Sequence, residues 1–263
     1  MKETIIQNLR ESCPWQDSLL WFDSLDSTNT RARELARQGA AHGTVLIADH
    51  QTGGRGRRGR SFHSPAGVGI YMSVVLRPRC APQEIMHLTC AAAVAMCDAV
   101  EAAVGFRPGI KWTNDLIWGK RKLGGILTEL AFKSDGTVDY AVVGIGINCR
   151  QKETDFPEEI RGIAASLSMV AEQDADPAKV AAAMVLSLEK MAASLFSPDW
   201  IARYQTDCVT VGQEISVVRG DTVRHGTALA VDPEGALIVR FSDGHEEAVS
   251  SGEVSVRGMY GYI

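Results

Sequence analysis

Four arginines and four glycines make up the segment GGRGRRGR at residues 53–60. Guanidinium groups carry forked N–H donors that match phosphate and carboxylate oxygens, and glycine lets a backbone move and approach a ligand closely. Because four like charges this close repel one another, we expect the empty segment to be mobile and to become ordered around an anion. The whole chain has a net charge of −5, so this basic character is local. The sequence therefore predicts an anion-binding loop.

Three other interpretations of this loop are weaker. Gly54, Gly56 and Gly59 match the dinucleotide fingerprint GxGxxG, but no helical pattern follows them, and residues 61–83 contain no acidic side chain for a ribose. A segment that binds RNA through Arg and Gly usually lies in a long disordered tract, whereas this one lies between two predicted strands. A solvated basic turn stays open as the plainest alternative.

A second polar group lies in the stretch KWTNDLIWGKRKLGGILTE, which begins at Lys111. Alternation along a short strand would place Lys111, Thr113 and Asp115 on one face, and a hairpin can bring Lys122 near that face. Glycine weakens a strand unless something packs closely against it, so the pair that ends at Gly125 favours a ligand at the backbone there. A solvated edge lysine is the alternative.

Two shorter motifs could add polar atoms to the same site. DSTN at 26–29 is a helix start, and the N-terminus of a helix offers free N–H groups to an anion. In VVGIGINC, the Asn148 amide can bind an oxygen or a metal-bound water, although a tight turn at a strand end would explain this motif equally well.

The elements that must position these groups alternate between helix and strand patterns. Capping residues and terminal glycines bound the helices, and β-branched runs indicate the strands. Such a mixture is typical of an α/β (α+β) domain. We predict helices over 27–39, 84–104, 177–196 and 198–205, and strands over 44–50, 67–76, 110–112, 115–118, 122–130 and 138–148.

After Cys208 the pattern changes to short alternating strands separated by turn residues, with no helical period. This pattern is typical of a small all-β barrel. We therefore divide the chain into a larger domain, 1–208, and a β-barrel domain, 209–263.

Composition limits the class of protein and its location. The 263 residues are 45% hydrophobic, enough for a substantial core. The first residues lack the apolar run of a signal peptide, and the most apolar stretch, CAAAVAMCDAV, breaks at Asp98, too short to span a membrane. The six cysteines show neither a CxxC pair nor zinc spacing, so we expect buried free thiols and a reducing cytoplasm.

Together, the motifs DSTN, QTGGRGRRGR, KWTNDL, KLGGILTE and GIGIN occur in the order and approximate spacing of the biotin–protein ligases. The last 50 or so residues resemble the SH3-like domain of that family, so the likeness extends from about residue 20 onward. It implies a class II synthetase-like domain with a mixed, largely antiparallel sheet. It also implies an enzyme that makes biotinyl-5′-AMP from biotin and ATP, then transfers biotin to a lysine of a biotin carboxyl carrier domain.

The resemblance assigns catalytic roles to four charged residues. Lys122 matches the lysine that contacts the biotin carboxylate and the α-phosphate, and Arg57 matches the arginine that keeps the adenylate bound. Lys111 and Asp115 match the side of the site near the phosphates and the acceptor lysine, where Asp115 could steer or accept a proton. Magnesium is expected mainly through the ATP phosphates, and its protein ligands stay open.

The resemblance also divides the binding residues between two ligands. A neutral ureido ring needs neutral donors and acceptors, whereas phosphates need cations. The residues implied for biotin are Ser27, Thr28, Asn29, Gln51, Arg55, Gly56, Arg57, Lys122 and Gly125, and those implied for ATP or the adenylate are Arg55, Arg57, Lys111, Asn114, Lys122 and Asn148.

Two residues depart from the family pattern: Thr113 stands where proline is common, and Phe62 stands where tryptophan is common. About 20 residues precede the likeness, too few for the DNA-binding domain of some relatives, so we expect no DNA partner. We also expect no membrane partner. The oligomeric state stays open, since an exposed strand of the sheet could serve self-association into a homodimer or docking of the carrier. A lipoate–protein ligase and an RNA-binding module stay open as alternative functions.

Overall fold

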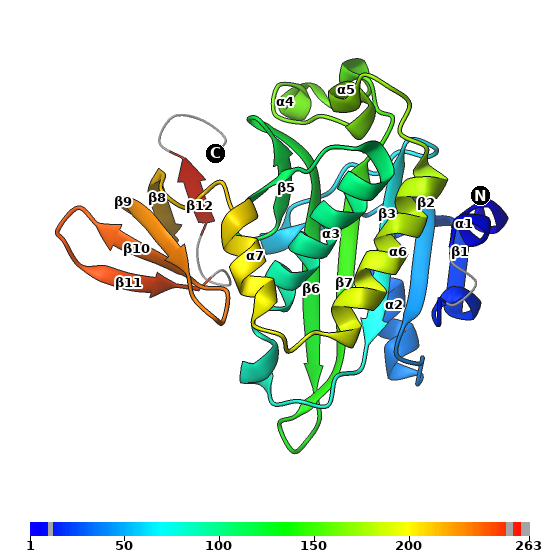
Figure 1. The fold of residues 1–263 in the computed structure, drawn as a ribbon, viewed down its shortest axis with the longest axis horizontal. Helices are drawn as coiled ribbons and strands as arrows, with labels where there is room; N and C mark the ends of the chain where they lie inside the picture. The colour runs from blue at the N-terminus through cyan, green and yellow to red at the C-terminus, as the bar shows by residue number, and fades with distance from the viewer. Residues whose placement is uncertain (10–12, 251–254, 259–263) are drawn as a thin grey trace.

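The computed structural model describes residues 1–9, 13–250 and 255–258, which form a larger α/β domain and a smaller β domain (Figure 1). The larger domain is built on a seven-stranded sheet of order β1-β2-β3-β7-β6-β5-β4. Within it β1 and β2 are parallel and the other pairs antiparallel, so the predicted mixed, largely antiparallel sheet is confirmed. The strands are β1 (Leu19–Leu25), β2 (Thr44–Gln51), β3 (Gly69–Leu76), β4 (Gly109–Lys111), β5 (Asp115–Trp118), β6 (Arg121–Phe132) and β7 (Val138–Asn148).

Helices cover both faces of this sheet (Figure 1). The alternation of side chains along each strand supplies a core on each side. On β2, Val45 belongs to the large core shared with α3 and α6, whereas Leu46 packs with Ala32 and Ala36 of α2. The helices are α1 (Lys2–Asn8), α2 (Thr28–Arg37), α3 (Leu88–Val104), α4 (Glu158–Arg161), α5 (Leu167–Ala171), α6 (Pro177–Ala193) and α7 (Asp199–Asp207), with 3-10 turns η1 (Gln16–Ser18), η2 (Arg57–Gly59), η3 (Pro82–Ile85) and η4 (Glu153–Asp155).

The central helix α3 is almost entirely buried because its alanine, valine, cysteine and methionine side chains contact the sheet, α6 and α7. It ends at Gly105, whose φ of 82° is left-handed. The stretch Pro82–Val104 is long and apolar enough, by length and composition alone, to cross a membrane. The expectation that no apolar stretch is long enough to span a membrane was therefore wrong on length. Most of this stretch is buried, however, as expected for the core helix of a folded domain.

The smaller domain is a five-stranded antiparallel sheet of order β11-β10-β9-β8-β12. The predicted small all-β domain is confirmed, but among the described residues its edge strands β11 and β12 do not pair with each other, so the sheet does not close into a barrel there. β12 pairs with β8 alone, which leaves its second edge without a partner strand there. The strands are β8 (Glu214–Arg219), β9 (Thr222–Val231), β10 (Leu237–Phe241), β11 (Glu246–Val249) and β12 (Ser255–Gly258).

The predicted helices and strands are all present, with shifted bounds. The helix expected from residue 84 is a 3-10 turn, η3, followed by α3 from Leu88, and α6 ends at Ala193 rather than near Phe196. The elements α1, β1, α4 and α5 were not predicted. The connection between α7 and β8 runs through the proposed domain boundary at 208/209.

Candidate active site

A cavity of about 480 Å³ opens between the arginine loop (residues 53–60), the start of α2, the β4–β5 hairpin and the strands β6 and β7. All but one of the residues predicted from the sequence line it. Those that do are Ser27, Thr28, Asn29, Gln51, Arg55, Gly56, Arg57, Lys111, Asn114, Asp115, Lys122 and Gly125.

The structure does not bring Asn148 to this cavity. Its side chain is buried at the end of β7, where Nδ2 donates to the carbonyl oxygen of Ala165 at 3.0 Å. Its Oδ1 accepts a hydrogen bond from Nε2 of Gln151 at 3.3 Å. The amide therefore fixes the chain after β7, and the geometry gives no support to the predicted contact with ATP.

The arginine loop is folded over the cavity as a compact turn. The backbone N–H of Gly56 donates to the carbonyl oxygen of Arg60 at 2.7 Å. Between them Arg58 has a φ of 56°, in the left-handed region, and Gly59 follows at 73°. A left-handed φ is uncommon for a residue with a side chain, so the surrounding contacts must hold this turn.

Arg57 connects this loop to the β4–β5 hairpin. Its Nη1 donates to Oδ1 of Asn114 at 2.9 Å. The Asn114 amide is fixed in turn, because its Nδ2 donates to the carbonyl oxygen of Ile126 at 2.9 Å. Burial lowers the pKa of the Arg57 guanidinium from its ordinary value, and the negative charge of Asp115 opposes that shift. The ordinary pKa of a guanidinium lies so far above neutral pH that Arg57 stays a cation.

The segment KWTND is a hairpin turn and not one continuous strand, so the predicted alternation was wrong in detail. Residues 112–114 form the turn between β4 and β5, and Lys111 and Asp115 are cross-strand partners. Partners across an antiparallel pair share a face, which is why both line the cavity. Thr113, expected on the same face, is buried in the turn.

Lys122 lies beside Asp115, as a hairpin was expected to place it. Its Nζ is 2.6 Å from Oδ1 of Asp115, and the two side chains are 28% and 18% exposed. Gly125 leaves room for this ion pair, because a Cβ there would lie 3.2 Å from the Lys122 Nζ and 3.3 Å from the Asp115 Oδ1. The glycine therefore serves a close approach by these side chains.

The opposite end of the cavity is neutral. Oε1 of Gln51 accepts from the backbone N–H of Thr28 at 2.9 Å and from its hydroxyl at 3.2 Å, so Gln51 caps α2 from a distant strand. The buried hydroxyl oxygen of Ser73 lies within hydrogen-bond distance of the Thr28 hydroxyl, at 2.8 Å, and of the Asn29 amide oxygen, at 2.7 Å. Ser73 was missed because it lies inside the apolar strand β3, away from every motif.

Other wall residues were also missed by the sequence reasoning. Phe62 lies over Gly146. A Cβ at Gly146 would be 2.5 Å from the Phe62 ring, so the glycine makes room for this aromatic side chain in the cavity wall. Arg58 and Arg60 belong to the basic run and could have been included on that basis. Trp112, Ile163 and Val256 carry no polar signal, and the tertiary fold alone brings them to the cavity.

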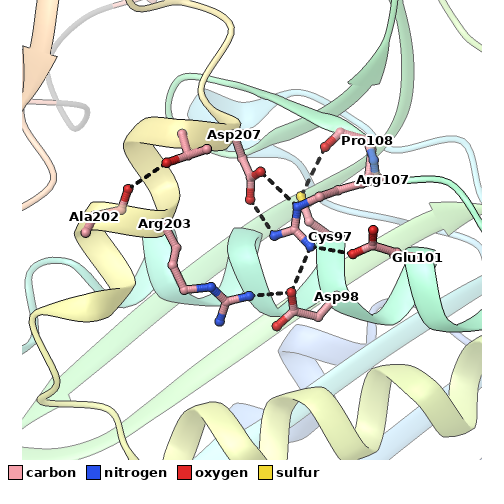
Figure 2. Close-up of polar contacts among 9 residues, drawn as sticks. Cys97, Asp98, Glu101, Arg107, Pro108, Ala202, Arg203 and Asp207 are labelled. Carbon is pink, nitrogen blue, oxygen red and sulfur yellow. Dashed lines mark hydrogen bonds and ion pairs between the residues drawn. The ribbon is translucent and has the colours of Figure 1, made fainter.

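An ion-pair network joins α3 and α7 through Arg107 and Arg203 (Figure 2). Arg107 donates through Nε to Oδ1 of Asp207 at 2.8 Å and through Nη1 to Asp98 and Glu101, both at 2.9 Å. Arg203 of α7 donates to the same oxygen of Asp98. These hydrogen bonds raise the pKa of the Arg107 guanidinium still further above its ordinary value.

The network holds two adjacent chain segments. Asp207 ends α7, and after it the N–H of Val209 donates to the carbonyl oxygen of Ile110 on β4 at 3.0 Å. Lys111 is the next residue along β4, so the position of this cation depends on α3 and α7 behind the sheet.

Comparisons with known proteins agree with this arrangement. The profile of the biotin/lipoate A/B protein ligase family matches residues 21–148, and that of the biotin protein ligase C terminal domain matches residues 210–257. The bifunctional ligase/repressor BirA of Bacillus subtilis is 37% identical over 237 residues, covering 89% of this chain and 72% of that protein. The chain belongs to the biotin protein ligase family.

Two further members of the family bear on the site. The biotin–[acetyl-CoA-carboxylase] ligase of Mycobacterium tuberculosis is 33% identical, covering 87% of this chain and 85% of that protein. The biotin protein ligase of Aquifex aeolicus, solved in complex with biotin and ATP, has a TM-score of 0.74 and 29% identity, covering 91% of this chain and 98% of the other. The match of residues 210–257 to the C-terminal domain shows that this chain carries more than the catalytic domain.

Proposed function

We propose that this chain activates biotin with ATP to biotinyl-5′-AMP and transfers the biotinyl group to a lysine of a carrier protein. The observation that carries this proposal is the division of one cavity into a neutral end, formed by Thr28 and Gln51, and a cationic end, formed by Arg57, Lys111 and Lys122. A ureido ring fits the first end and a triphosphate fits the second, so the biotin carboxylate would meet the α-phosphate between them.

In the first step, a biotin carboxylate oxygen attacks the α-phosphorus and pyrophosphate leaves. Two anions must approach each other, and cations fixed in place offset their repulsion without reorganising. Lys122 is the best placed to do so, because the ion pair with Asp115 holds its ammonium in position before the ligands arrive. Arg57 and Lys111 add charge on the phosphate side.

Magnesium would enter on the triphosphate. Among residues 1–9, 13–250 and 255–258, no three His, Cys, Asp or Glu side chains cluster into a metal site. On the cationic wall, oxygen donors come from Asp115 and Asn114, which fits an ion held mainly by phosphate oxygens. When bound, the ion supplies further neutralisation of the phosphate charge.

In the second step, the amine of the acceptor lysine attacks the mixed anhydride and AMP leaves. An ammonium must lose its proton before it can attack, and the Asp115 carboxylate is the acidic group on the cavity wall. We propose that Asp115 steers this amine and accepts the proton once Lys122 has turned to the ligand.

The names of the relatives favour a carboxylase as the acceptor, so we propose the biotin carboxyl carrier domain of an acyl-CoA carboxylase as the macromolecular substrate. We place the reaction in the cytoplasm, and the six free, buried cysteines support that location. The proposal includes no DNA or membrane partner and allows a homodimer.

Pyrophosphate exchange tests the first step. With Mg²⁺ and ATP, we expect exchange that depends on biotin and not on lipoate, and transfer of biotin to a purified carrier domain. Lys122→Ala should lower the exchange rate at least about 100-fold, because it removes a charge stabiliser from the reacting centre. Exchange that depends on lipoate and not on biotin would reject the proposal. Absence of biotin-dependent exchange, together with RNA binding that biotin and ATP do not affect, would reject it as well.

A further inference from the structure

Glu129 on β6 is a carboxylate just outside the cavity wall that receives three side chains. Nη1 of Arg55 lies 3.2 Å from its Oε1, and Nη1 of Arg33 lies 3.1 Å from the same oxygen. Nδ2 of Asn29 donates to its Oε2 at 2.9 Å. The Glu129 side chain is 20% exposed, so a charge held largely away from water is matched by two guanidinium groups.

These contacts join three separate parts of the cavity. Arg55 belongs to the arginine loop, while Asn29 and Arg33 lie one turn apart on α2 and so face the same side. β6, which carries Glu129, continues back to Lys122 and Gly125. Glu129 is therefore a second point, beside the Arg57–Asn114 hydrogen bond, at which the loop is attached to the framework of the site.

The contact with Arg55 leaves part of its guanidinium available. The Nη1 atom of Arg55 makes both contacts with the Glu129 carboxylate. Among the described residues, Nε and Nη2 of Arg55 have no partner, and Arg55 lines the cavity. One nitrogen thus anchors the side chain while the rest of the fork can donate to a bound anion.

The same carboxylate fixes the amide of Asn29. Nδ2 of Asn29 donates to Glu129 and to the carbonyl oxygen of Leu127, at 2.9 and 3.2 Å, and Oδ1 accepts from Ser73 at 2.7 Å. A Cβ at Gly144 would lie 1.7 Å from that Oδ1, so the amide occupies the space above the glycine. Both Nδ2 hydrogens are used within the protein, so Asn29 fixes the start of α2 against β6. The second lone pair of its Oδ1 is the group left for a ligand.

We propose that Glu129 is a positioning residue that holds the arginine loop closed and orients Arg55 toward the ligand anion. The proposal rests on the biotin-activating function for its kinetic consequences, but the closure of the loop does not depend on any activity. Removing the charge of Glu129 weakens closure, so ligands bind less tightly and the adenylate leaves earlier, while the chemistry at Lys122 is unchanged.

Trypsin measures loop closure directly, because the loop carries four arginines and a protease needs an opened segment. In the ligand-free protein, Glu129→Gln should increase the rate of cleavage within residues 55–60 roughly two- to fivefold. The matched control is Glu34→Gln, which removes an ion pair with Arg31 elsewhere on α2 and should cleave at the wild-type rate. A wild-type cleavage rate in Glu129→Gln overturns the proposal, whatever the enzyme's activity.

Kinetics then separates positioning from general destabilisation. In pyrophosphate exchange, Glu129→Gln should raise the KM for biotin roughly threefold or more, with kcat within about twofold of wild type. In an Arg55→Gln background the same change should add nothing, because its effect passes through Arg55. Additive effects, or a fall in kcat alone, would contradict the role. Absence of biotin-dependent exchange in the wild type would instead reject the proposed function and leave the trypsin result standing.

Discussion

Charge at the reacting end of the cavity is organised before a substrate arrives. Lys122 is paired with Asp115 at 2.6 Å, and Arg57 is hydrogen bonded to Asn114. Fixed charges of this kind stabilise developing negative charge without a cost of reorganisation at the moment of reaction. In the proposed reaction, the incoming carboxylate and phosphate would replace Asp115 as the partner of Lys122, which would couple binding and activation at one ion pair.

The first prediction concerns retention of the intermediate by Arg57. Arg57→Gly removes a cation from the cavity wall and the hydrogen bond to Asn114, so we expect adenylate still to form but to dissociate roughly tenfold faster or more. Mass spectrometry of free biotinyl-5′-AMP and labelling of unrelated proteins at lysine measure the leak. Arg79→Gly, an exposed change outside the cavity, is the control and should not leak. No leaked adenylate in Arg57→Gly would remove this role.

A second prediction concerns the buried hydroxyl of Thr113. Its Oγ1 has no hydrogen-bond partner among the described residues, and an unpaired buried hydroxyl destabilises a fold. Thr113→Val should therefore increase the free energy of unfolding by about 1 kcal/mol in urea denaturation. Thr210→Val is the matched control with the opposite sign, because the Thr210 hydroxyl accepts the Trp112 N–H at 2.9 Å. Equal losses in both variants would refute the argument.

Residues that line the cavity were predictable where a chemically suitable side chain lies in a short polar motif. Lys122 and Arg57 belong to short polar motifs, and neighbouring residues of each motif line the same part of the cavity. Ser73 and Glu129 could not be found this way, because their roles depend on partners about 44 and 74 positions away. Asn148 shows the reverse case, since a motif that suggested a ligand contact is used by the local backbone.

At the level of elements, periodicity predicted the helices and strands that form the two cores, and failed where no period exists. α4 and α5 are one turn long, and the edge strand β1 is largely half-exposed, so neither gives a pattern over enough residues. The alternation across KWTND was wrong because residues 112–114 turn the chain, and of these Asn114 alone is a typical turn residue. The shape of this turn comes instead from tertiary contacts, such as the Tyr204 hydroxyl that donates to the Thr113 carbonyl at 3.0 Å.

The third prediction belongs to the ion-pair network behind that hairpin. Arg107→Gln leaves Asp207 and Asp98 without their shared cation, so we expect a loss of about 1–3 kcal/mol of stability and a higher KM for ATP through Lys111. Thermal unfolding and exchange kinetics measure the two effects. The control Arg31→Gln breaks an exposed pair and should change stability by less than about 0.5 kcal/mol. An unchanged KM for ATP would show that the network does not position Lys111.

Across the whole molecule, the smaller domain takes part in the site. Val256 of β12 lines the cavity, and Nε1 of Trp112, another wall residue, donates to the carbonyl oxygen of Gly235 at 3.0 Å. Trp112 is thus held by the β9–β10 turn of one domain while it shapes the cavity of the other.

The last prediction concerns the pH dependence of global stability, to which the buried thiols contribute. Burial raises the pKa of Cys90, Cys97 and Cys208 above the ordinary value and that of Cys149 to about 12. Folded thiols therefore keep protons that unfolded thiols release near pH 9, so their stabilisation is complete below pH 9 and is lost as the pH rises toward 12. Between pH 8 and 10 we expect the Cys149 thiol to lower the free energy of unfolding by about 1–2 kcal/mol, measured by urea denaturation. Cys149→Ala should flatten that slope by about one proton, and an unchanged slope would show that this thiol does not contribute.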